Sequence, residues 1–369
     1  MVEMQGLINS TGCTNTIGNA SGDIHGKIVF QGSARNSIAK FVKICADNIK
    51  ESGGNQHTSV LAVGMLQCVT PVGKILHGAC VINQRCGELY ELLAERWKLP
   101  RAKLLVSVIG DLQDESDIEN LERFKAEIRS ISQTAGAWIV TSGLHNGIAQ
   151  YVGDALYDES NPVTLGIAPW GIIEGREKFT GTDTECYKNV YYKACCLSDR
   201  RSGYLDPNHY NFLFIDDSNV DQYDMEMEFR AKFEAHIVGK ENTPYVLIIS
   251  GGGVQTFHCI VEAILRGDKV VLIPNTGGMA DWIKEIIENF TATESNVVFE
   301  KQLKAIFGDE YVMKLNLLKE NKDLFVLYNK EPCNTGMLTS CLMNAKCKEI
   351  DSVRTANYFK MTQFWDLPY

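Results

Sequence analysis

The chain has 369 residues, of which 45 % are hydrophobic and 22 % charged, and its formal net charge is −10. This length can hold one large domain or two ordinary ones, and the negative charge argues against a surface that binds nucleic acid or an anionic membrane. No stretch approaches the roughly 18 apolar residues that span a bilayer, and the N-terminus lacks the pattern of a secretory signal. The 12 cysteines include no CxxC pair of the kind that binds zinc. We therefore expect a soluble segment of a reducing compartment, without direct membrane insertion, metal or cofactor.

The first hundred residues predict little regular structure. Residues 1–22 are rich in Gly, Ser, Thr and Asn, so we expect a disordered tail. Residues 23–100 predict a small β/helical subdomain, although residues 51–82 show no clear hydrophobic period. Within this subdomain the predicted strands and the predicted helix are Lys27–Phe30, Phe41–Ile44 and Gly87–Trp97.

Six short apolar runs dominate residues 101–292. Each is apolar on consecutive residues, as a parallel strand covered on both faces requires. Helix-period segments lie between most of them, so the pattern predicts an α/β, Rossmann-like, doubly wound parallel sheet. The predicted strands are Leu104–Ile109, Trp138–Thr141, Thr164–Ala168, Phe212–Ile215, Val246–Ile249 and Val270–Ile273.

Several of these strands end in small or acidic residues, which stand where an open parallel sheet binds ligands. Glycine at a strand end lets backbone N–H groups approach phosphate oxygens, and the N-terminus of the following helix favours an anion. The turns therefore predict a nucleotide-type ligand. They are Gly110-Asp111, Thr141-Ser142-Gly143, Asp216-Asp217, Gly251-Gly252-Gly253 and Asn275-Thr276-Gly277-Gly278.

Two segments fall outside the strand–helix alternation. Residues 171–207 are too long for an ordinary connection and predict a functional loop or an insertion. Residues 293–369 predict a helical extension with apolar patches. We expect Trp138 to lie in the core.

Four motifs, in this order, resemble the N-terminal cytosolic region of melastatin-type transient receptor potential (TRPM) channels. The resemblance covers roughly residues 25–290, and the helical tail is similar to the start of that family's helical repeats. The motifs are Leu104–Gly110, Thr134–Gly143, Gly166–Gly171 and Asn208–Asp217.

The resemblance implies a nucleotide-binding fold shared with bacterial lysine-decarboxylase-like (LOG) proteins, a fold also called SLOG. In ADP-ribose-gated members of the family it implies that the pocket binds ADP-ribose. It also implies that the segment lies on the cytoplasmic side of a plasma-membrane channel and that its macromolecular partner is the rest of a homotetrameric channel. The pore lies outside these residues.

The turn after the second predicted strand supplies five candidate ligand contacts. They are Thr141, Ser142, Gly143, His145 and Asn146. The turn stands where the family has Thr-Gly-Gly and a polar turn into a helix. The alternative is an ordinary strand-to-helix turn in which Asn146 is the N-cap and His145 is solvated.

Tyr223 and Arg230 match the family's Tyr-Gly-x-Glu-x-x-x-Arg pattern. Tyr223 can stack an adenine, and Arg230 can offer a planar fork to a diphosphate. Their spacing of seven would place both on one helix face. The alternative is a surface pair between Arg230 and Glu226.

The third candidate turn is similar to the family's Glu-Gly-Gly-Pro-x-Thr. Gly252, Gly253 and Thr256 keep the close backbone approach and the helix start, whereas Gly251 and Val254 replace Glu and Pro. Glu262 does not have the spacing of the catalytic Glu in LOG proteins.

The fourth turn contributes Thr276, Gly277 and Gly278. ADP-ribose-gated relatives have an Arg at the position of Gly278, so the resemblance implies the loss of one contact to the diphosphate. Asp111, which replaces a glycine, would repel a phosphate placed against it. Replacing Gly278 by Arg should then tighten binding.

We therefore expect a non-catalytic, ligand-sensing domain of a TRPM-like cation channel, which binds an adenine nucleotide of the ADP-ribose class to regulate gating. Two alternatives are a structural assembly domain with a vestigial pocket and a LOG-like nucleotide phosphoribohydrolase. The sequence places no paired acid and base, or nucleophile and base, beside the glycine turns, so we expect no turnover of nucleotide.

Overall fold

The computed structural model describes residues 24–28, 63–69, 76–81, 86–110, 118–134, 136–159, 162–174, 190–194, 203–215, 226–288, 294–328 and 338. The predicted tail 1–22 and the predicted strand Phe41–Ile44 lie outside these residues. So do Asp111 and Tyr223.

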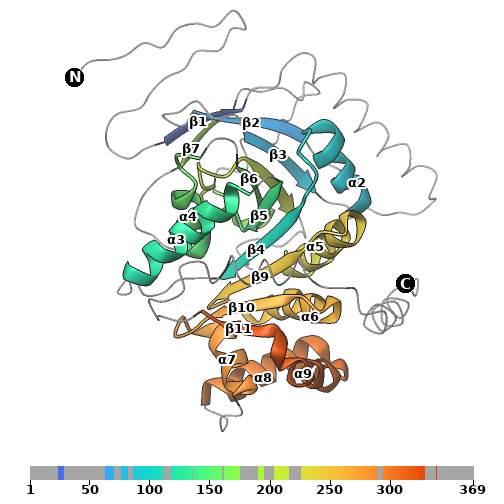
Figure 1. The fold of residues 1–369 in the computed structure, drawn as a ribbon. Coiled ribbons are helices and arrows are strands. Elements are labelled where there is room, and N and C mark those ends of the chain that lie inside the picture. The colour runs from blue at the N-terminus through green and yellow to red at the C-terminus, as the bar shows by residue number, and fades with distance from the viewer. Residues whose placement is uncertain are drawn as a thin grey trace, which may run out of the picture. The chain divides into compact units, whose positions relative to one another are not determined.

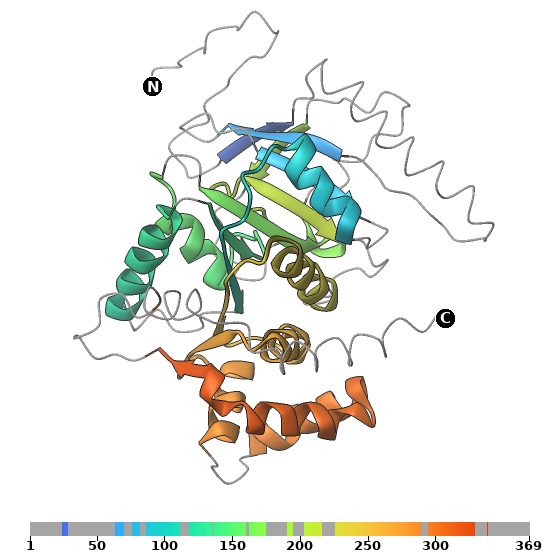
Figure 2. The same ribbon diagram turned by 45° about the vertical axis from the view of Figure 1, so that its right-hand side comes forward.

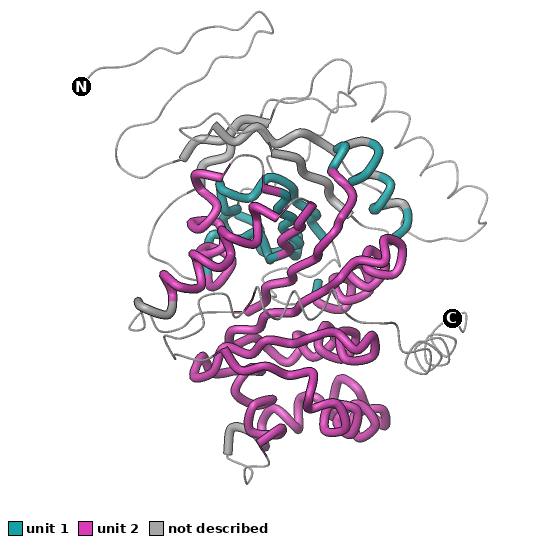
Figure 3. Tube along the Cα trace, in the orientation of Figure 1, with its two compact units in different colours: residues 1–99, 141–146, 163–226 teal, residues 100–140, 147–162, 227–369 magenta. Residues whose placement is uncertain are grey.

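The chain forms two compact units that interleave along the sequence (Figure 3). Unit 1 comprises residues 1–99, 141–146 and 163–226, and unit 2 comprises residues 100–140, 147–162 and 227–369. Residues 101–292 therefore contribute to both units. The boundaries at 23, 101 and 293 stay a prediction.

Unit 2 is built on parallel strands in the order β11-β10-β9-β4-β5, and each neighbouring pair is parallel. The central strands β4 and β9 are buried along almost their whole length, which agrees with their uninterrupted apolar sequence. The strands are β4 (Leu104–Gly110), β5 (Ala137–Thr141), β9 (Tyr245–Ser250), β10 (Lys269–Ile273) and β11 (Phe325–Leu327).

Helices lie on both sides of these strands, with α3 and α4 on one side and α5 and α6 on the other (Figures 1 and 2). The helices are α3 (Ile118–Ser132), α4 (Gly147–Ala155), α5 (Met227–Glu241), α6 (Phe257–Arg266), α7 (Gly278–Ile287), α8 (Glu294–Phe307) and α9 (Glu310–Glu320). Two short 3₁₀ turns, η4 (Val254–Thr256) and η5 (Lys322–Leu324), precede α6 and β11.

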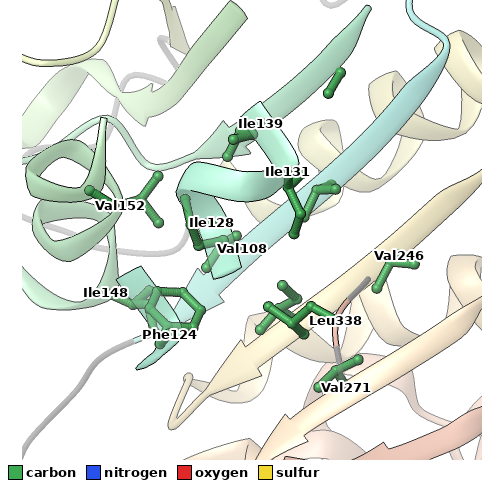
Figure 4. Packing of buried hydrophobic residues seen from close by; sticks show 14 of the residues in the cluster. Val108, Phe124, Ile128, Ile131, Ile139, Ile148, Val152, Val246, Val271 and Leu338 are labelled. Carbon is green, nitrogen blue, oxygen red and sulfur yellow. The ribbon is translucent and has the colours of Figure 1, made fainter. Parts of the chain in front are cut away.

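The apolar stripe of α3 enters the core of unit 2. Phe124, Ile128 and Ile131 are almost completely buried in a cluster that also contains Val108 of β4 and Val246 of β9 (Figure 4). Their spacing of four and three residues places them on one helix face. Trp138 is 1 % exposed and donates its indole N–H to the carbonyl of Pro100 at 2.9 Å, so its predicted core position is confirmed.

Unit 1 has the strand order β6-β8-β3-β2-β1-β7. β6, β8 and β3 pair in parallel, whereas β3 with β2, β2 with β1, and β1 with β7 pair antiparallel. The strands are β1 (Ile24–Ile28), β2 (Val63–Val69), β3 (Leu76–Val81), β6 (Val163–Pro169), β7 (Val190–Ala194) and β8 (Asn211–Ile215). The helical elements are α2 (Cys86–Glu91), the π-helical turn η1 (Leu92–Arg96) and the 3₁₀ turn η2 (Trp170–Ile172).

All six strands predicted from apolar runs are present, and the α/β Rossmann-like fold is confirmed. One other expectation needs correction, because the region predicted as helical contains β11. Residues 51–82, which show no clear hydrophobic period, contain β2 and β3, and residues 171–207, predicted as a loop or an insertion, contain β7. Glycines interrupt β2 and β3, and β11 is too short to show a period, so partner strands decide these elements. Among the described helices, none combines the length and apolar character needed to cross a lipid bilayer.

Candidate functional site

The carboxyl ends of β4, β9 and β10 lie against one another through their backbones. Gly110 ends β4 with φ +109°, and a Cβ there would overlap the carbonyl oxygen of Ser250. Gly278 follows β10 with φ +58°, and a Cβ there would overlap the carbonyl oxygen of Gly252. Only glycine fits such a close approach at a positive φ. These glycines therefore fix the packing of three adjacent strand ends.

Hydrogen bonds join the turn after β9 to the turn after β10. The hydroxyl of Thr276 donates to the carbonyl of Ile273 and accepts the N–H of Gly251, both at 2.7 Å. The N–H groups of Met279 and Ala280 donate to the carbonyls of Gly252 and Gly251 at 2.8 and 2.9 Å. The Thr276 hydroxyl thus holds the two turns together.

The amides at the N-terminus of α7 are already bound to a carboxylate of the same chain. Asp281 accepts the N–H of Asn275 on one oxygen and the N–H of Gly277 on the other, both at 2.8 Å. A carboxylate at this position stabilises the positive end of a helix, as a phosphate would. A phosphate bound to the amide of the predicted contact Gly277 would have to displace Asp281.

The turn before α6 is different, because two of its N–H groups and one hydroxyl have no hydrogen-bond partner among the described residues. Gly252 and Gly253 are partly exposed. No described group accepts a hydrogen bond from either of their N–H groups. The hydroxyl oxygen of Thr256 is buried without a hydrogen-bond partner among the same residues, and it lies 3.0 Å from where a Cβ on Gly252 would be. An unsatisfied buried hydroxyl is costly. The structure thus groups three predicted contacts around a polar position with spare hydrogen-bonding capacity.

Arg230 lies in the same unit, but its side chain is completely buried against β4 and β5. Its Nε donates to Glu234 at 2.9 Å, and its Nη2 lies 2.8–3.1 Å from the Ser107 hydroxyl and the carbonyls of Val108 and Val140. Only Nη1 has no hydrogen-bond partner in the described ranges. The alternative of a surface pair with Glu226 is therefore wrong, because the partner is the buried Glu234.

Glu234 is the shared hydrogen-bond acceptor of this buried cluster. It also accepts hydrogen bonds from Ser107 and Tyr245, both at 2.7 Å. Burial alone would lower the pKa of Arg230, but the Glu234 carboxylate outweighs it and raises this pKa. Burial, together with the same carboxylate, raises the pKa of Tyr245 well above its usual value. Arg230 therefore stabilises β4 and β5 near their carboxyl ends by donating hydrogen bonds to the carbonyls of Val108 and Val140. A direct contact with a diphosphate stays a prediction.

The turn at Thr141–Asn146 belongs to unit 1, where Thr141 enters a buried polar chain. Its hydroxyl lies 2.7 Å from Nε2 of His209 and accepts the N–H of Gly143 at 2.8 Å. His209 Nδ1 in turn lies 3.0 Å from Asp206. Thr141, His209 and Asp206 are all 0 % exposed. The order hydroxyl, imidazole, carboxylate is that of a nucleophile and its base, which the sequence did not predict, but here all three groups are enclosed.

His145 is anchored to the same carboxylate. Its Nδ1 lies 2.8 Å from the second oxygen of Asp206, and its N–H donates to the carbonyl of Tyr204 at 2.7 Å. The alternative of a merely solvated His145 is therefore wrong. His145 and His209 are thus both hydrogen-bonding partners of Asp206. In the ranges that the structure describes, no three His, Cys, Asp or Glu side chains are arranged to hold a metal.

The remaining predicted contacts of this turn have local roles. The Ser142 hydroxyl accepts the N–H of Leu144 at 3.4 Å, and the Gly143 carbonyl accepts the N–H of Asp206 at 2.8 Å. Asn146 directly precedes α4. Tyr223 lies outside the described residues, so its stacking on a base stays a prediction, as do ligand contacts of Thr141–Asn146.

We expect Asp206→Asn to reduce the acid sensitivity of the fold. Burial alone would raise the pKa of Asp206, but hydrogen bonds from His145 and His209 outweigh it and lower this pKa below the usual 3.8. A lowered pKa contributes stability above the unfolded value, and that stability is lost as the pH falls below about 4. The measurement is urea unfolding of wild type and variant at pH 7 and at pH 3.5.

The matched control is Asp158→Asn, which changes an exposed carboxylate in the turn after α4. Asp158→Asn should leave the difference in unfolding free energy between the two pH values unchanged. An equal pH dependence in wild type and Asp206→Asn would contradict the prediction.

Sequence reasoning missed the partners of the predicted residues. For Arg230 a local signal existed, because Glu234 follows it at the i,i+4 spacing of a helical ion pair. His209 lies in the Asn208–Asp217 motif, Asp206 lies two residues before it, and Asp281 lies three residues after the fourth turn. Ser107 and Tyr245 carried no local signal, since they come from strands 123 positions before and 15 positions after Arg230.

Comparisons with known proteins identify a family for the part of the chain that carries these strands and glycine turns. A family model described as SLOG in TRPM matches residues 79–320, which is more than half of the chain. The chain belongs to this family. The match covers β4, β9, β10 and the turns that follow them.

Several TRPM proteins are similar to the chain over this region. Rat transient receptor potential cation channel subfamily M member 2 is 29 % identical over 60 % of the chain. Human member 6 is 27 % identical over 72 % of the chain, and mouse member 1 is 31 % identical over 50 %. The matched segments span only 16 %, 13 % and 12 % of these three relatives.

Proposed function

We propose that this chain is the cytosolic regulatory region of a TRPM-type cation channel and that it binds an adenine nucleotide of the ADP-ribose class. Its membership of the SLOG in TRPM family supports the first half of the proposal. The relatives are named as cation channels. A bound nucleotide would change gating only to the extent that its affinity differs between the closed and open states.

The observation that carries the nucleotide proposal is the turn before α6. The amides of Gly252 and Gly253 and the buried hydroxyl of Thr256 lie together with no acceptor or donor assigned to them in the described ranges. Backbone amides at a strand end, followed by a helix N-terminus, suit a phosphate. We place the diphosphate here and not at α7, because Asp281 occupies the amides of Gly277 and Asn275.

A second candidate function is that of an assembly domain with a vestigial pocket. The carboxylate of Asp281 favours this alternative. Asp281 supplies internally the anion that the α7 amides would otherwise bind. Gly278 carries no cation, and the charge of Arg230 is compensated by Glu234. Under this alternative the unit keeps the fold for assembly alone and binds no nucleotide.

We further propose that the ligand is bound and not cleaved. The hydroxyl–imidazole–carboxylate chain that contains Thr141 belongs to unit 1, whereas the turn proposed for the diphosphate belongs to unit 2, and the Thr141 hydroxyl already accepts the N–H of Gly143. A nucleophile must reach the reacting atom of its substrate. A LOG-like phosphoribohydrolase would instead release ribose phosphate or a free base, which analysis of the nucleotide after incubation detects.

We expect Thr256→Val to weaken ADP-ribose binding by about 1.5–3 kcal/mol, the value of a hydrogen bond to a charged group. Valine keeps the shape of threonine and removes only the hydroxyl. Since this hydroxyl has no hydrogen-bond partner among the described residues, its removal should not lower the free energy of unfolding. The measurement is isothermal titration calorimetry of wild type and variant with ADP-ribose, alongside urea unfolding of both proteins.

The control is Thr256→Ser, which keeps the hydroxyl and should retain most of the affinity. If wild type shows no binding of ADP-ribose in this titration, the nucleotide proposal fails and the assembly domain with a vestigial pocket remains. Equal affinities of wild type and Thr256→Val for ADP-ribose would contradict a diphosphate contact at this turn.

A further inference from the structure

Two helix N-termini lie side by side at the strand ends of unit 2. The first turn of α7 is bonded to the turn before α6, because the N–H of Met279 donates to the carbonyl of Gly252 at 2.8 Å. A Cβ on Gly278, the first residue of α7, would lie 3.1 Å from the backbone nitrogen of Gly252. An anion bound at one of these helix N-termini is therefore close to the other.

The two helix N-termini differ in what occupies them. At α7, one oxygen of the Asp281 carboxylate accepts the N–H of Asn275 and the other accepts the N–H of Gly277, both at 2.8 Å. At α6, Thr256 is 0 % exposed, and its hydroxyl has no hydrogen-bond partner among the described residues. A buried polar group without a partner is rare and costly, so it indicates a position for a ligand. The α6 end is thus open to an anion, whereas the α7 end already holds one.

The Asp281 carboxylate also limits the negative charge that a ligand can bring to these strand ends. Like charges repel strongly where the surroundings are partly buried, and Asp281 is only partly exposed. Two positions that could offset it do not. Gly278 has no side chain, and the charge of Arg230 is compensated by the buried Glu234. A phosphate group beyond the one at α6 would therefore meet a carboxylate and amides that are already bonded.

We propose, on the basis of the proposed function, that Asp281 determines the specificity of the site by selecting against nucleotides with more phosphate groups than the diphosphate of ADP-ribose. The ligand then binds at the turn before α6 alone, and the carboxylate excludes further phosphate groups from α7. Nucleoside triphosphates are the class that it rejects. ATP carries about two more negative charges than ADP-ribose, because a terminal phosphate loses its second proton at about pH 6.

The test is isothermal titration calorimetry of the full chain with ADP-ribose and with ATP at pH 7, without divalent cations that would neutralise the phosphates. Wild type should bind ADP-ribose about tenfold or more tightly than ATP. Asp281→Asn keeps the shape of the side chain and removes its charge, so it should reduce this ratio to about threefold or less. The control Glu288→Gln removes an exposed carboxylate at the other end of α7 and should leave the ratio unchanged.

The ratio of the two affinities separates selection from a purely structural role of Asp281, which would change both affinities by the same factor. An equal ratio in wild type and Asp281→Asn would overturn the inference and leave the proposed function intact. So would wild type that binds ATP as tightly as ADP-ribose, a result that does not depend on the stability of the variant. If only Asp281→Asn binds nucleotide, the proposed function fails, but the exclusion of phosphate by Asp281 holds. If neither protein binds either nucleotide, both fail.

Discussion

Arg230→Ala should lower the free energy of unfolding by about 3–5 kcal/mol, the cost of leaving a buried charge without its partner. Glu234 would lose its ion pair while remaining 1 % exposed. Ser107, Val108 and Val140 would lose their contact with the guanidinium. The measurement is urea unfolding followed by tryptophan fluorescence.

Lys232→Ala is the matched control for Arg230→Ala. Lys232 lies on the same helix and pairs with Glu228 at the same i,i+4 spacing, but both side chains are 54 % exposed. Such surface pairs contribute about 0.2–1 kcal/mol. The prediction is wrong if Arg230→Ala costs no more than Lys232→Ala.

Gly278→Arg should destabilise unit 2 by at least about 1–3 kcal/mol, because a residue with a side chain would be forced to a positive φ. Its Cβ would also overlap the carbonyl oxygen of Gly252, which accepts the N–H of Met279. This outcome is opposite to the tighter binding expected from the family motif, since the backbone here leaves no room for the arginine found in ADP-ribose-gated relatives. Urea unfolding and calorimetry with ADP-ribose measure the two effects.

Gly239→Ala is the control for Gly278→Arg, because, apart from the neighbouring backbone of α5, no described atom lies within 4 Å of a Cβ at position 239. A glycine-to-alanine change inside a helix should be neutral or stabilising by about 0.5–1 kcal/mol. A stable Gly278→Arg that binds ADP-ribose more tightly than wild type would show that the backbone of this turn can move to admit the family's arginine.

The candidate site was only partly predictable from the sequence. The glycines that end β4 and follow β9 and β10 were found because glycine after an apolar run marks a strand end. The partners were not found, because hydrogen bonds such as that between Arg230 and Ser107 join residues far apart along the chain. The Arg230 motif predicted a clamp on a ligand, and the fold instead turns this side chain inward to Glu234.

The sequence by itself determined the six central strands, the α/β fold and the family. Consecutive apolar residues suit a strand covered on both faces, and this pattern is local enough to read from one chain. Only the tertiary structure decided how β2, β3, β7 and β11 pair, why Gly278 cannot carry a side chain, and that Asp281 occupies the amides of α7. These outcomes depend on distances between segments that the chain brings together only when it folds, and no local pattern of residue types encodes such distances.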